Sequence, residues 1–194
     1  MEWEWLGGDH ITYAVRDIES WKAVYIDCFG FREIHHTRDA SPEGTSSMEL
    51  YGLESGHSRI ALVSPINREE ISHVQYFISK HGDHSIQHVA YGIRNLEAFI
   101  TEMKAKGFNF LGDIKYRSDA FGQVKQIFAK RFDANLTPAD GAFYEFVERP
   151  VQTEADGADF FSHTTAKDLY EDVERDVVND DGKPFKAFMS WIYS

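Results

Sequence analysis

The feature that most constrains the fold of this chain is an internal repeat. Residues 7–15, GGDHITYAV, and residues 85–93, SIQHVAYGI, both read as a short strand. In each, a His is followed directly by a β-branched residue and, three positions after the His, by a Tyr. One supersecondary unit therefore occurs twice, and the fold must accommodate two equivalent copies of it.

The similarity extends beyond these two strands. Each is followed by a helical pattern, with Asp17 or Asn95 as the expected N-cap and Gly30 or Gly107 at the end. Further strand-like segments bounded by turn residues then follow in each copy. The sequence thus predicts an α+β fold built from two tandem βαβββ units. The two units and the helix that connects them are expected at residues 7–66, 85–149 and 68–84.

The charge distribution marks a boundary after Pro150. Residues 151–194 contain ten acidic and four basic residues, a net charge of −6 out of −12 for the whole chain. Within them Leu169, Val173 and Val177 are four apart, which gives one apolar stripe on an otherwise charged helix. We expect one domain over residues 1–150 and an acidic helical C-terminal tail that packs on the domain or on a partner subunit.

Composition excludes several classes of protein. A net charge of −12 makes nucleic acid and anionic membranes poor partners, because both are bound by clustered Lys and Arg. The single cysteine, Cys28, cannot form an internal disulfide. The N-terminus lacks the basic start and apolar run of a signal peptide, and no segment is apolar enough to span a membrane. These features are typical of a cytoplasmic protein.

Three residues are candidate metal ligands. His10 and His88 occupy equivalent places in the two units, so an approximate two-fold axis between the units brings their side chains to one interior. Glu145 lies in the last strand of the second unit and shares a face with Phe143 and Val147. A carboxylate on such an apolar face needs a cation or a strong donor. Two imidazoles and one carboxylate, with coordination positions left open, suit non-heme Fe(II) and oxygen chemistry.

The other histidines are weaker candidates. His35 and His36 are adjacent, so on a strand they point to opposite faces and cannot bind the same ion. The rest lie in loop or helix contexts, where solvated or capping roles are the default: His57, His73, His81, His84 and His163. The last strand of the first unit, SRIALVSP, is apolar where a fourth ligand would lie, which favours an open site with three protein ligands.

In these segments the chain resembles the catalytic C-terminal half of 4-hydroxyphenylpyruvate dioxygenase. GDHITYAV is similar to the first ligand strand of that family, and residues 71–111 are similar to its segment around the second ligand. QIFAKRFD followed by GAFYEFVERP resembles the run into the third ligand. The resemblance implies a vicinal-oxygen-chelate fold, in which the two units form a barrel-like sheet.

The resemblance also implies a substrate pocket. Gln87 and Gln126 match polar residues of the family's catalytic pocket, and they would orient the polar end of the substrate. Without the resemblance, the residues implied as substrate contacts would be assigned to turns or to the core. These are Pro65, Asn67, Phe128, Phe143, Phe160 and Phe161, the last two from a helix that closes the pocket.

The activity implied by the resemblance is that of an Fe(II) dioxygenase. A 2-oxo acid binds the iron through its carboxylate and keto oxygens, O2 is the co-substrate, and the same molecule is decarboxylated and oxidised. In that family a noncatalytic half precedes the catalytic one, and the apolar face it covers would be exposed here unless two chains pair, so we expect a homodimer.

Three alternatives remain open. An extradiol ring-cleaving dioxygenase shares the fold and the ligand set. A glyoxalase or epimerase would use a divalent metal without redox chemistry and would need another protein ligand. A binding protein of the bleomycin-resistance type would sequester its ligand without any metal.

Overall fold

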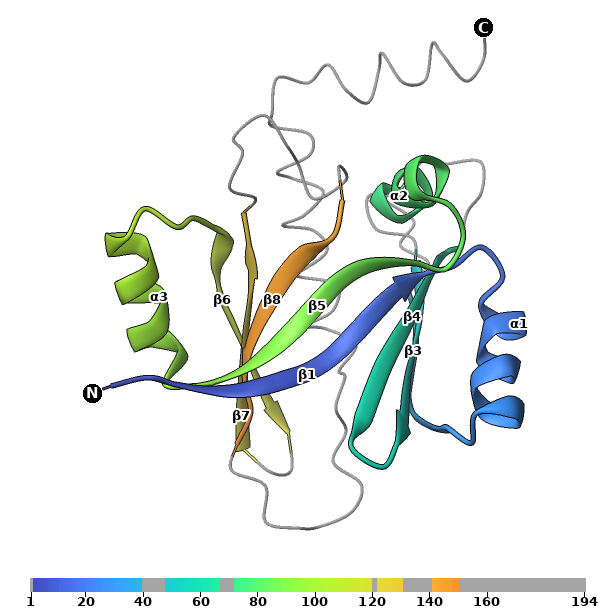
Figure 1. The fold of residues 1–194 in the computed structure, drawn as a ribbon, viewed down its shortest axis with the longest axis horizontal. Helices are drawn as coiled ribbons and strands as arrows, with labels where there is room; N and C mark the ends of the chain where they lie inside the picture. The colour runs from blue at the N-terminus through green and yellow to red at the C-terminus, as the bar shows by residue number, and fades with distance from the viewer. Residues whose placement is uncertain (1, 40–47, 67–71, 120–121, 131–140, 151–194) are drawn as a thin grey trace, which may run out of the picture.

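Two antiparallel strands, β1 (Glu4–Ala14) and β5 (Ser85–Arg94), form the centre of an eight-stranded sheet (Figure 1). The computed structural model describes residues 2–39, 48–66, 72–119, 122–130 and 141–150. The strand order, β2-β3-β4-β1-β5-β8-β7-β6, is symmetric about the central pair. The outer strands are β2 (Arg32–Asp39), β3 (Met48–Ser55), β4 (Ser58–Pro65), β6 (Phe110–Asp119), β7 (Gly122–Ala129) and β8 (Phe143–Glu148).

Each half of the sheet repeats one connection. β4 runs parallel to β1, and β8 runs parallel to β5, while the remaining neighbours within each half are antiparallel. The predicted α+β class with two βαβββ units is therefore confirmed. Within the described residues the sheet is not closed, because β2 and β6 are its two edges.

Two helices cover one face of the sheet. α1 (Ile18–Ala23), which continues as a π-helical turn (Val24–Cys28), packs on the first half, and α3 (Leu96–Ala105) packs on the second (Figure 1). The strand residues they bury include Ile60 and Leu62 in the first half, next to Val15 directly after β1, and Ile93, Ile127 and Phe146 in the second.

A third helix covers the opposite face. α2 (His73–His81) packs Val74, Phe77 and Ile78 against strand residues that alternate with those beneath α1. The buried strand residues beneath it are Ala14, Met48, Leu50, Ala61 and Val63. The opposite face of the first half is thus closed by an apolar cluster.

The ends of the helices match the sequence expectations only in part. Asp17 caps α1, where its carboxylate accepts a hydrogen bond from the Ser20 N–H at 3.1 Å. Asn95 stands at the same position of α3, but its φ of 62° is left-handed and its side chain makes no capping hydrogen bond. The N–H of Leu96 donates instead to Glu148 Oε2 at 2.9 Å. Asn95 thus stands at the expected N-cap position of α3, but without a side-chain capping hydrogen bond.

The connecting helix is shorter at its C-terminal end than the sequence suggests. α2 begins after Ser72, whose hydroxyl accepts from the Gln75 N–H, and it ends at His81, before Gly82 with its φ of 91°. Residues 67–71, and with them the start expected for this helix, lie outside the described residues, as does the predicted tail at 151–194. None of the described helices is long and apolar enough to cross a membrane.

Candidate metal centre

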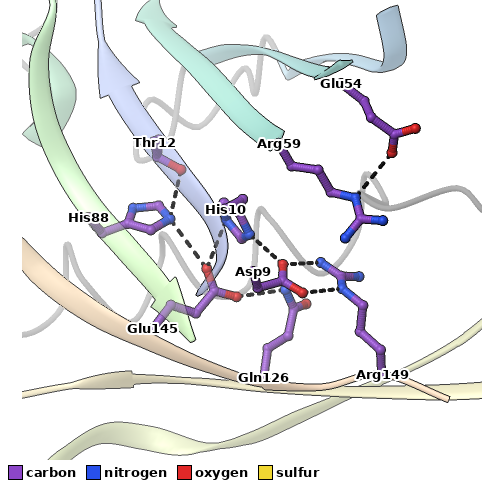
Figure 2. Close-up of polar contacts among 9 residues, drawn as sticks. All are labelled: Asp9, His10, Thr12, Glu54, Arg59, His88, Gln126, Glu145 and Arg149. Atoms are coloured by element: carbon purple, nitrogen blue, oxygen red, sulfur yellow. Dashed lines mark hydrogen bonds and ion pairs between the residues drawn. The ribbon is translucent and has the colours of Figure 1, made fainter. Parts of the chain in front are cut away.

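The three predicted ligands lie together on the face of the sheet that α2 also covers, which we call the site face (Figure 2). His10, His88 and Glu145 are 5%, 3% and 2% exposed. Glu145 Oε2 is 3.3 Å from Nε2 of His10 and 3.3 Å from Nε2 of His88. One potential ligand atom from each residue lies within 4.8 Å of the other two.

Strand register explains how the three residues meet. His10 of β1 pairs with Ala90 of β5, and Ala90 pairs in turn with Glu145 of β8. His10 and Glu145 therefore lie in one row across the sheet, on either side of Ala90. His88 precedes Ala90 by two residues and therefore points to the same side. This row crosses the central strand pair, so residues far apart in the sequence become neighbours.

The pKa values of His10, Glu145 and His88 depend on one another, because the three side chains are buried in contact. Burial alone would lower the pKa of His10, but the charge of Glu145 and the hydrogen bond to Asp9 outweigh it and raise that pKa to about 9. Burial alone would raise the pKa of Glu145, but His10 and His88 lower it to about 2. Burial lowers the pKa of His88, which stays neutral. Without a metal, the protonated imidazole of His10 is thus held against the carboxylate of Glu145 at the centre of the site.

An ion-pair chain supports His10 from behind. The Nδ1–H of His10 donates to Asp9 Oδ1 at 2.7 Å, which leaves Nε2 directed at Glu145. Asp9 in turn accepts two hydrogen bonds from the guanidinium group of Arg149, both of 2.7 Å. Arg149 and the His10 contact keep the pKa of Asp9 well below its usual range despite burial. Outer carboxylates of this kind fix the orientation of a metal-binding imidazole.

Neutral groups support the other two ligands. The Nδ1–H of His88 donates to Gln87 Oε1 at 3.3 Å, and its Nε2 lies 2.9 Å from the Thr12 hydroxyl. The amide of Gln126 donates to Glu145 Oε1 at 2.7 Å. Gln87 and Gln126, predicted from the resemblance to act in the catalytic pocket, are both buried and contact ligand side chains here.

The predicted substrate contacts are only partly within the described residues. Phe128 and Phe143 are buried, pack with Leu111, and place their ring centroids 5.2 Å from that of His88. Pro65 is buried at the end of β4. Asn67, Phe160 and Phe161 lie outside the described residues. The observed part is an apolar wall beside His88.

Several residues of the site were not predicted from the sequence. Asp9 and Arg149 were not singled out, although the acidic residue directly before the first His was a possible signal. His73 was expected to be solvated or to act as a cap, but it begins α2 and is only 4% exposed, close enough to His88 for its charge to lower the pKa of His88. Nothing in its local sequence indicated that α2 covers the site face.

The residues present fit a divalent metal ion. Two Nε2 atoms and one carboxylate oxygen converge in an interior where a carboxylate would otherwise be costly, and the Nδ1 atom of each imidazole has an oxygen partner. In the first half, the strand residue equivalent to Glu145 is Ala61, which supplies no fourth ligand. The arrangement matches a metal site with open coordination positions.

The fold and this site define a known class. The chain belongs to the glyoxalase/bleomycin resistance protein/dioxygenase superfamily, whose sequence profile matches residues 9–126. That superfamily includes enzymes, among them dioxygenases and epimerases. No curated protein is similar enough to the chain to count as a match.

Several solved structures share the fold. A 4-hydroxymandelate synthase mutant from Streptomyces coelicolor has a TM-score of 0.74 at 19% identity, with 88% of this chain and 54% of that chain covered. The chain therefore spans about half the length of that enzyme. Hypothetical protein BH1468 from Bacillus halodurans C-125 has a TM-score of 0.56 at 28% identity, with 80% and 100% covered. A methylmalonyl-CoA epimerase variant from Streptomyces coelicolor has a TM-score of 0.53 at 23% identity, with 75% and 98% covered.

Proposed function

We propose that the chain is a non-heme Fe(II) dioxygenase that acts on a 2-oxo acid and oxidises the molecule it decarboxylates. The observation that carries the proposal is the buried group of His10, His88 and Glu145 on the site face. Iron bound there would supply a site at which a 2-oxo acid and O2 meet. A 4-hydroxyphenylpyruvate-like substrate is favoured by the resemblance of the sequence to that family and by the likeness in fold to 4-hydroxymandelate synthase.

The residues around the site hold the candidate ligands in position and would orient the substrate. Asp9 and Gln87 accept from the Nδ1 atoms of the two imidazoles, so both Nε2 atoms are presented to the metal. Gln126 holds one oxygen of Glu145, and the other oxygen faces the imidazoles. Phe128 and Phe143 exclude water beside His88 and would contact the apolar body of the substrate.

Other functions within the superfamily make different demands on the site. An extradiol dioxygenase would use the same three ligands on a catechol. An epimerase or glyoxalase would need another ligand, and Ala61 occupies the position equivalent to Glu145. A metal-free binding protein would have no use for a buried carboxylate between two imidazoles. The three candidate ligands therefore support an oxygen-using enzyme over these alternatives.

The test is anaerobic loading with Fe(II) followed by a panel of 2-oxo acids and catechols. We expect a charge-transfer absorption band with a 2-oxo acid, and CO2 release with O2 consumption after air is admitted. Ring cleavage of a catechol without decarboxylation would replace the proposal with an extradiol activity. Failure to bind Fe(II) at all would favour the metal-free binding protein.

We also propose that the chain acts as a homodimer. Large apolar side chains are exposed on β1 and β8, among them Trp5 and Leu6 of β1 and Tyr144 of β8, which are 48%, 53% and 45% exposed. Burial of such residues against a second copy would remove apolar surface from water. Size-exclusion chromatography with light scattering should give twice the chain mass of 22.3 kDa, and a monomer over the micromolar range would contradict the proposal.

A further inference from the structure

The hydroxyl of Thr12 lies beside the candidate metal centre. Thr12 is fully buried on β1, and its Oγ1 atom is 2.9 Å from Nε2 of His88. The proton of the His88 imidazole is on Nδ1, which donates it to Gln87 Oε1, so Nε2 accepts and the Thr12 hydroxyl donates. Figure 2 shows that the hydroxyl and the Glu145 carboxylate approach the same nitrogen from different directions. The hydroxyl therefore lies at the edge of the space in which a metal would bind.

The fold does not require a hydroxyl at this position. The two central strands pair so that each histidine lies opposite the residue two positions after the other one: His10 opposite Ala90, and His88 opposite Thr12. Ala90 is therefore the equivalent of Thr12 in the second unit, and it is just as deeply buried. Since a methyl group is sufficient beside His10, the hydroxyl beside His88 is a polar group that packing alone does not explain.

A metal ion at the centre would take the acceptor of this hydroxyl. A neutral imidazole binds a metal through the nitrogen that carries no proton, which in His88 is the Nε2 atom that accepts from Thr12. In the described part of the chain, no other side chain is bonded to the Thr12 hydroxyl. A buried hydroxyl without a hydrogen bond is unfavourable, so Thr12 needs a new acceptor in the metal-bound protein.

The nearest described side chains of the site face do not offer this acceptor. Thr12 lies between His10 and Ala14 along β1, and it pairs with Ala61 of β4 and with His88 of β5. The two alanines carry only methyl groups. The Nε2 atoms of the two histidines are candidate metal ligands themselves.

The Glu145 carboxylate is already committed. One of its oxygens accepts from the Gln126 amide at 2.7 Å, and the other is the candidate metal ligand. The remaining acceptor is an oxygen atom of a molecule that occupies an open coordination position of the metal. Such an oxygen is negatively charged in a bound carboxylate, and hydrogen bonds to charged acceptors are shorter and stronger than neutral ones.

We propose that Thr12 positions the ligand of the metal, by donating a hydrogen bond from its hydroxyl to the oxygen atom that this ligand places next to His88. This role rests on the function proposed above and deepens it, because in a 2-oxo acid the acceptor is the carboxylate or the keto oxygen. Thr12 thereby favours ligands that present an oxygen acceptor at this position over ligands that do not. The hydroxyl then has a partner in both states, Nε2 of His88 without metal and the ligand oxygen with it.

The first experiment measures ligand binding to protein loaded with Co(II), whose visible absorption changes when its ligands change. Oxalate presents oxygen acceptors to the hydroxyl, whereas imidazole, once bound to a metal, presents none. Thr12→Val keeps the shape of the side chain and should weaken oxalate binding by about tenfold or more, with imidazole binding changed by less than about twofold. Thr12→Ser, which keeps a hydroxyl, should restore oxalate binding to within about threefold of wild type.

Thr37→Val is the matched control. Thr37 is also buried on the site face, because it pairs with Leu50, which belongs to the apolar cluster beneath α2. It lies on the edge strand β2, which β3 and β4 separate from β1, so the same substitution should change oxalate binding by less than about twofold. Competition with a chelator measures the affinity for Co(II). This affinity should change by less than about threefold in Thr12→Val, since the lost hydroxyl had a partner in both states.

Three results would overturn the proposal, with circular dichroism showing that each variant is folded. The first is oxalate binding by Thr12→Val that is as tight as in wild type. The second is an equal loss of oxalate and imidazole binding, which would indicate a distorted metal site in place of a lost donor. The third is wild-type protein that binds no divalent metal.

A second experiment identifies which oxygen of a 2-oxo acid accepts the hydrogen bond. In protein loaded with Fe(II) without O2, the proposed function predicts a charge-transfer band. A hydrogen bond to the keto oxygen lowers the energy of this band, because the transferred electron enters the carbonyl π* orbital. A shift to shorter wavelength in Thr12→Val would therefore assign the hydroxyl to the keto oxygen, and weaker binding with an unshifted band would assign it to the carboxylate. No CO2 release after O2 is admitted, with the oxalate result intact, would reject the proposed function and leave the role of Thr12 standing.

Discussion

In the first half of the sheet Thr12 pairs with Ala61, and in the second half the equivalent residue, Ala90, pairs with Glu145. The backbone arrangement is the same in both halves, with a parallel pair next to the central strands. The side chains differ, since one half offers a methyl group and the other a carboxylate. Repetition of a fold therefore need not repeat its chemistry.

The two halves also differ in what covers the site face. In the first half α2 buries Ala61 and Val63 beneath Val74 and Phe77. In the second half the same face carries Gln126 and Glu145 next to the aromatic wall of Phe128 and Phe143. One half thus contributes an apolar core, and the other contributes most of the polar groups of the site.

The residues before the two histidines sharpen this comparison. Asp9 accepts from the Nδ1–H of His10 at 2.7 Å and is charged, whereas Gln87 accepts from the Nδ1–H of His88 at 3.3 Å and is neutral. Hydrogen bonds to a charged acceptor are shorter and stronger than neutral ones. The support of the two imidazoles is therefore unequal.

The largest effect is expected from Glu145→Ala, which makes the second half match the first at this position. Loss of a ligand should cost more than the 10–100-fold loss of affinity typical of outer groups, so we expect affinity for Fe(II) to fall by more than about 100-fold. Metal content measured by mass spectrometry checks this, with Ala61→Ser as the control that should keep its metal. Stoichiometric iron in folded Glu145→Ala would show that the carboxylate of the second half is not needed for metal binding.

The next effect tests the unequal support of the imidazoles. Asp9→Asn removes the charge behind His10 and should weaken metal binding by about 10–100-fold, as is typical of outer-shell changes. Gln87→Leu removes a longer, neutral hydrogen bond and should cost less than about tenfold. Competition with a chelator measures both affinities. A larger loss of affinity for Gln87→Leu than for Asp9→Asn would show that Gln87 supports metal binding more than Asp9 does.

A third effect concerns protons. The pKa of His10 is raised from 6.5 to about 9 and that of His88 is lowered, so at pH 7 the metal-free protein holds a proton on His10 alone. Metal binding should release about one proton, and affinity should rise by up to about tenfold per pH unit until pH 9. Calorimetry in buffers of different ionisation enthalpy counts the protons. If no proton is released on metal binding, His10 is neutral in the metal-free protein, as His88 is.

The same shift predicts how the stability of the metal-free protein depends on pH. The folded state holds the His10 proton more tightly than the unfolded state, so its contribution to the free energy of unfolding is complete below pH 6.5 and is lost as pH rises through about 9. Denaturant unfolding at several pH values measures it. The His10→Gln variant should not show this loss.

The smallest effect compares the helices of the two halves. Asp17 caps α1 through its side chain, so Asp17→Ala should lower the free energy of unfolding by about 1 kcal/mol, and Asp17→Ser should restore most of it. Chemical denaturation gives both values. A change as small for Asp17→Ala as for Asp17→Ser would mean that α1 does not depend on the residue at its N-cap.

Much of the fold was predictable because it rests on local patterns that occur twice. Strand alternation and the repeated His placed His10 and His88 at equivalent positions, and the apolar neighbours of Glu145 marked its carboxylate as one that needed a partner. Local patterns were less reliable at the ends of helices. Asn95 has the residue type of an N-cap and stands at that position, but its backbone is left-handed and its side chain makes no capping hydrogen bond.

The sequence by itself determined the two βαβββ units and the three residues that meet at their junction, since a period of two and a repeated motif can be read along the chain. Only the tertiary structure decided what surrounds them. Asp9 and Arg149 are separated by 140 positions, and their ion pair exists because β1 and β8 both flank β5. Arg59 and Arg149 line one cavity for the same reason, and the apolar core beneath α2 comes from the first half of the sheet. Contacts between strands depend on the order and register of the whole sheet, which no short segment encodes.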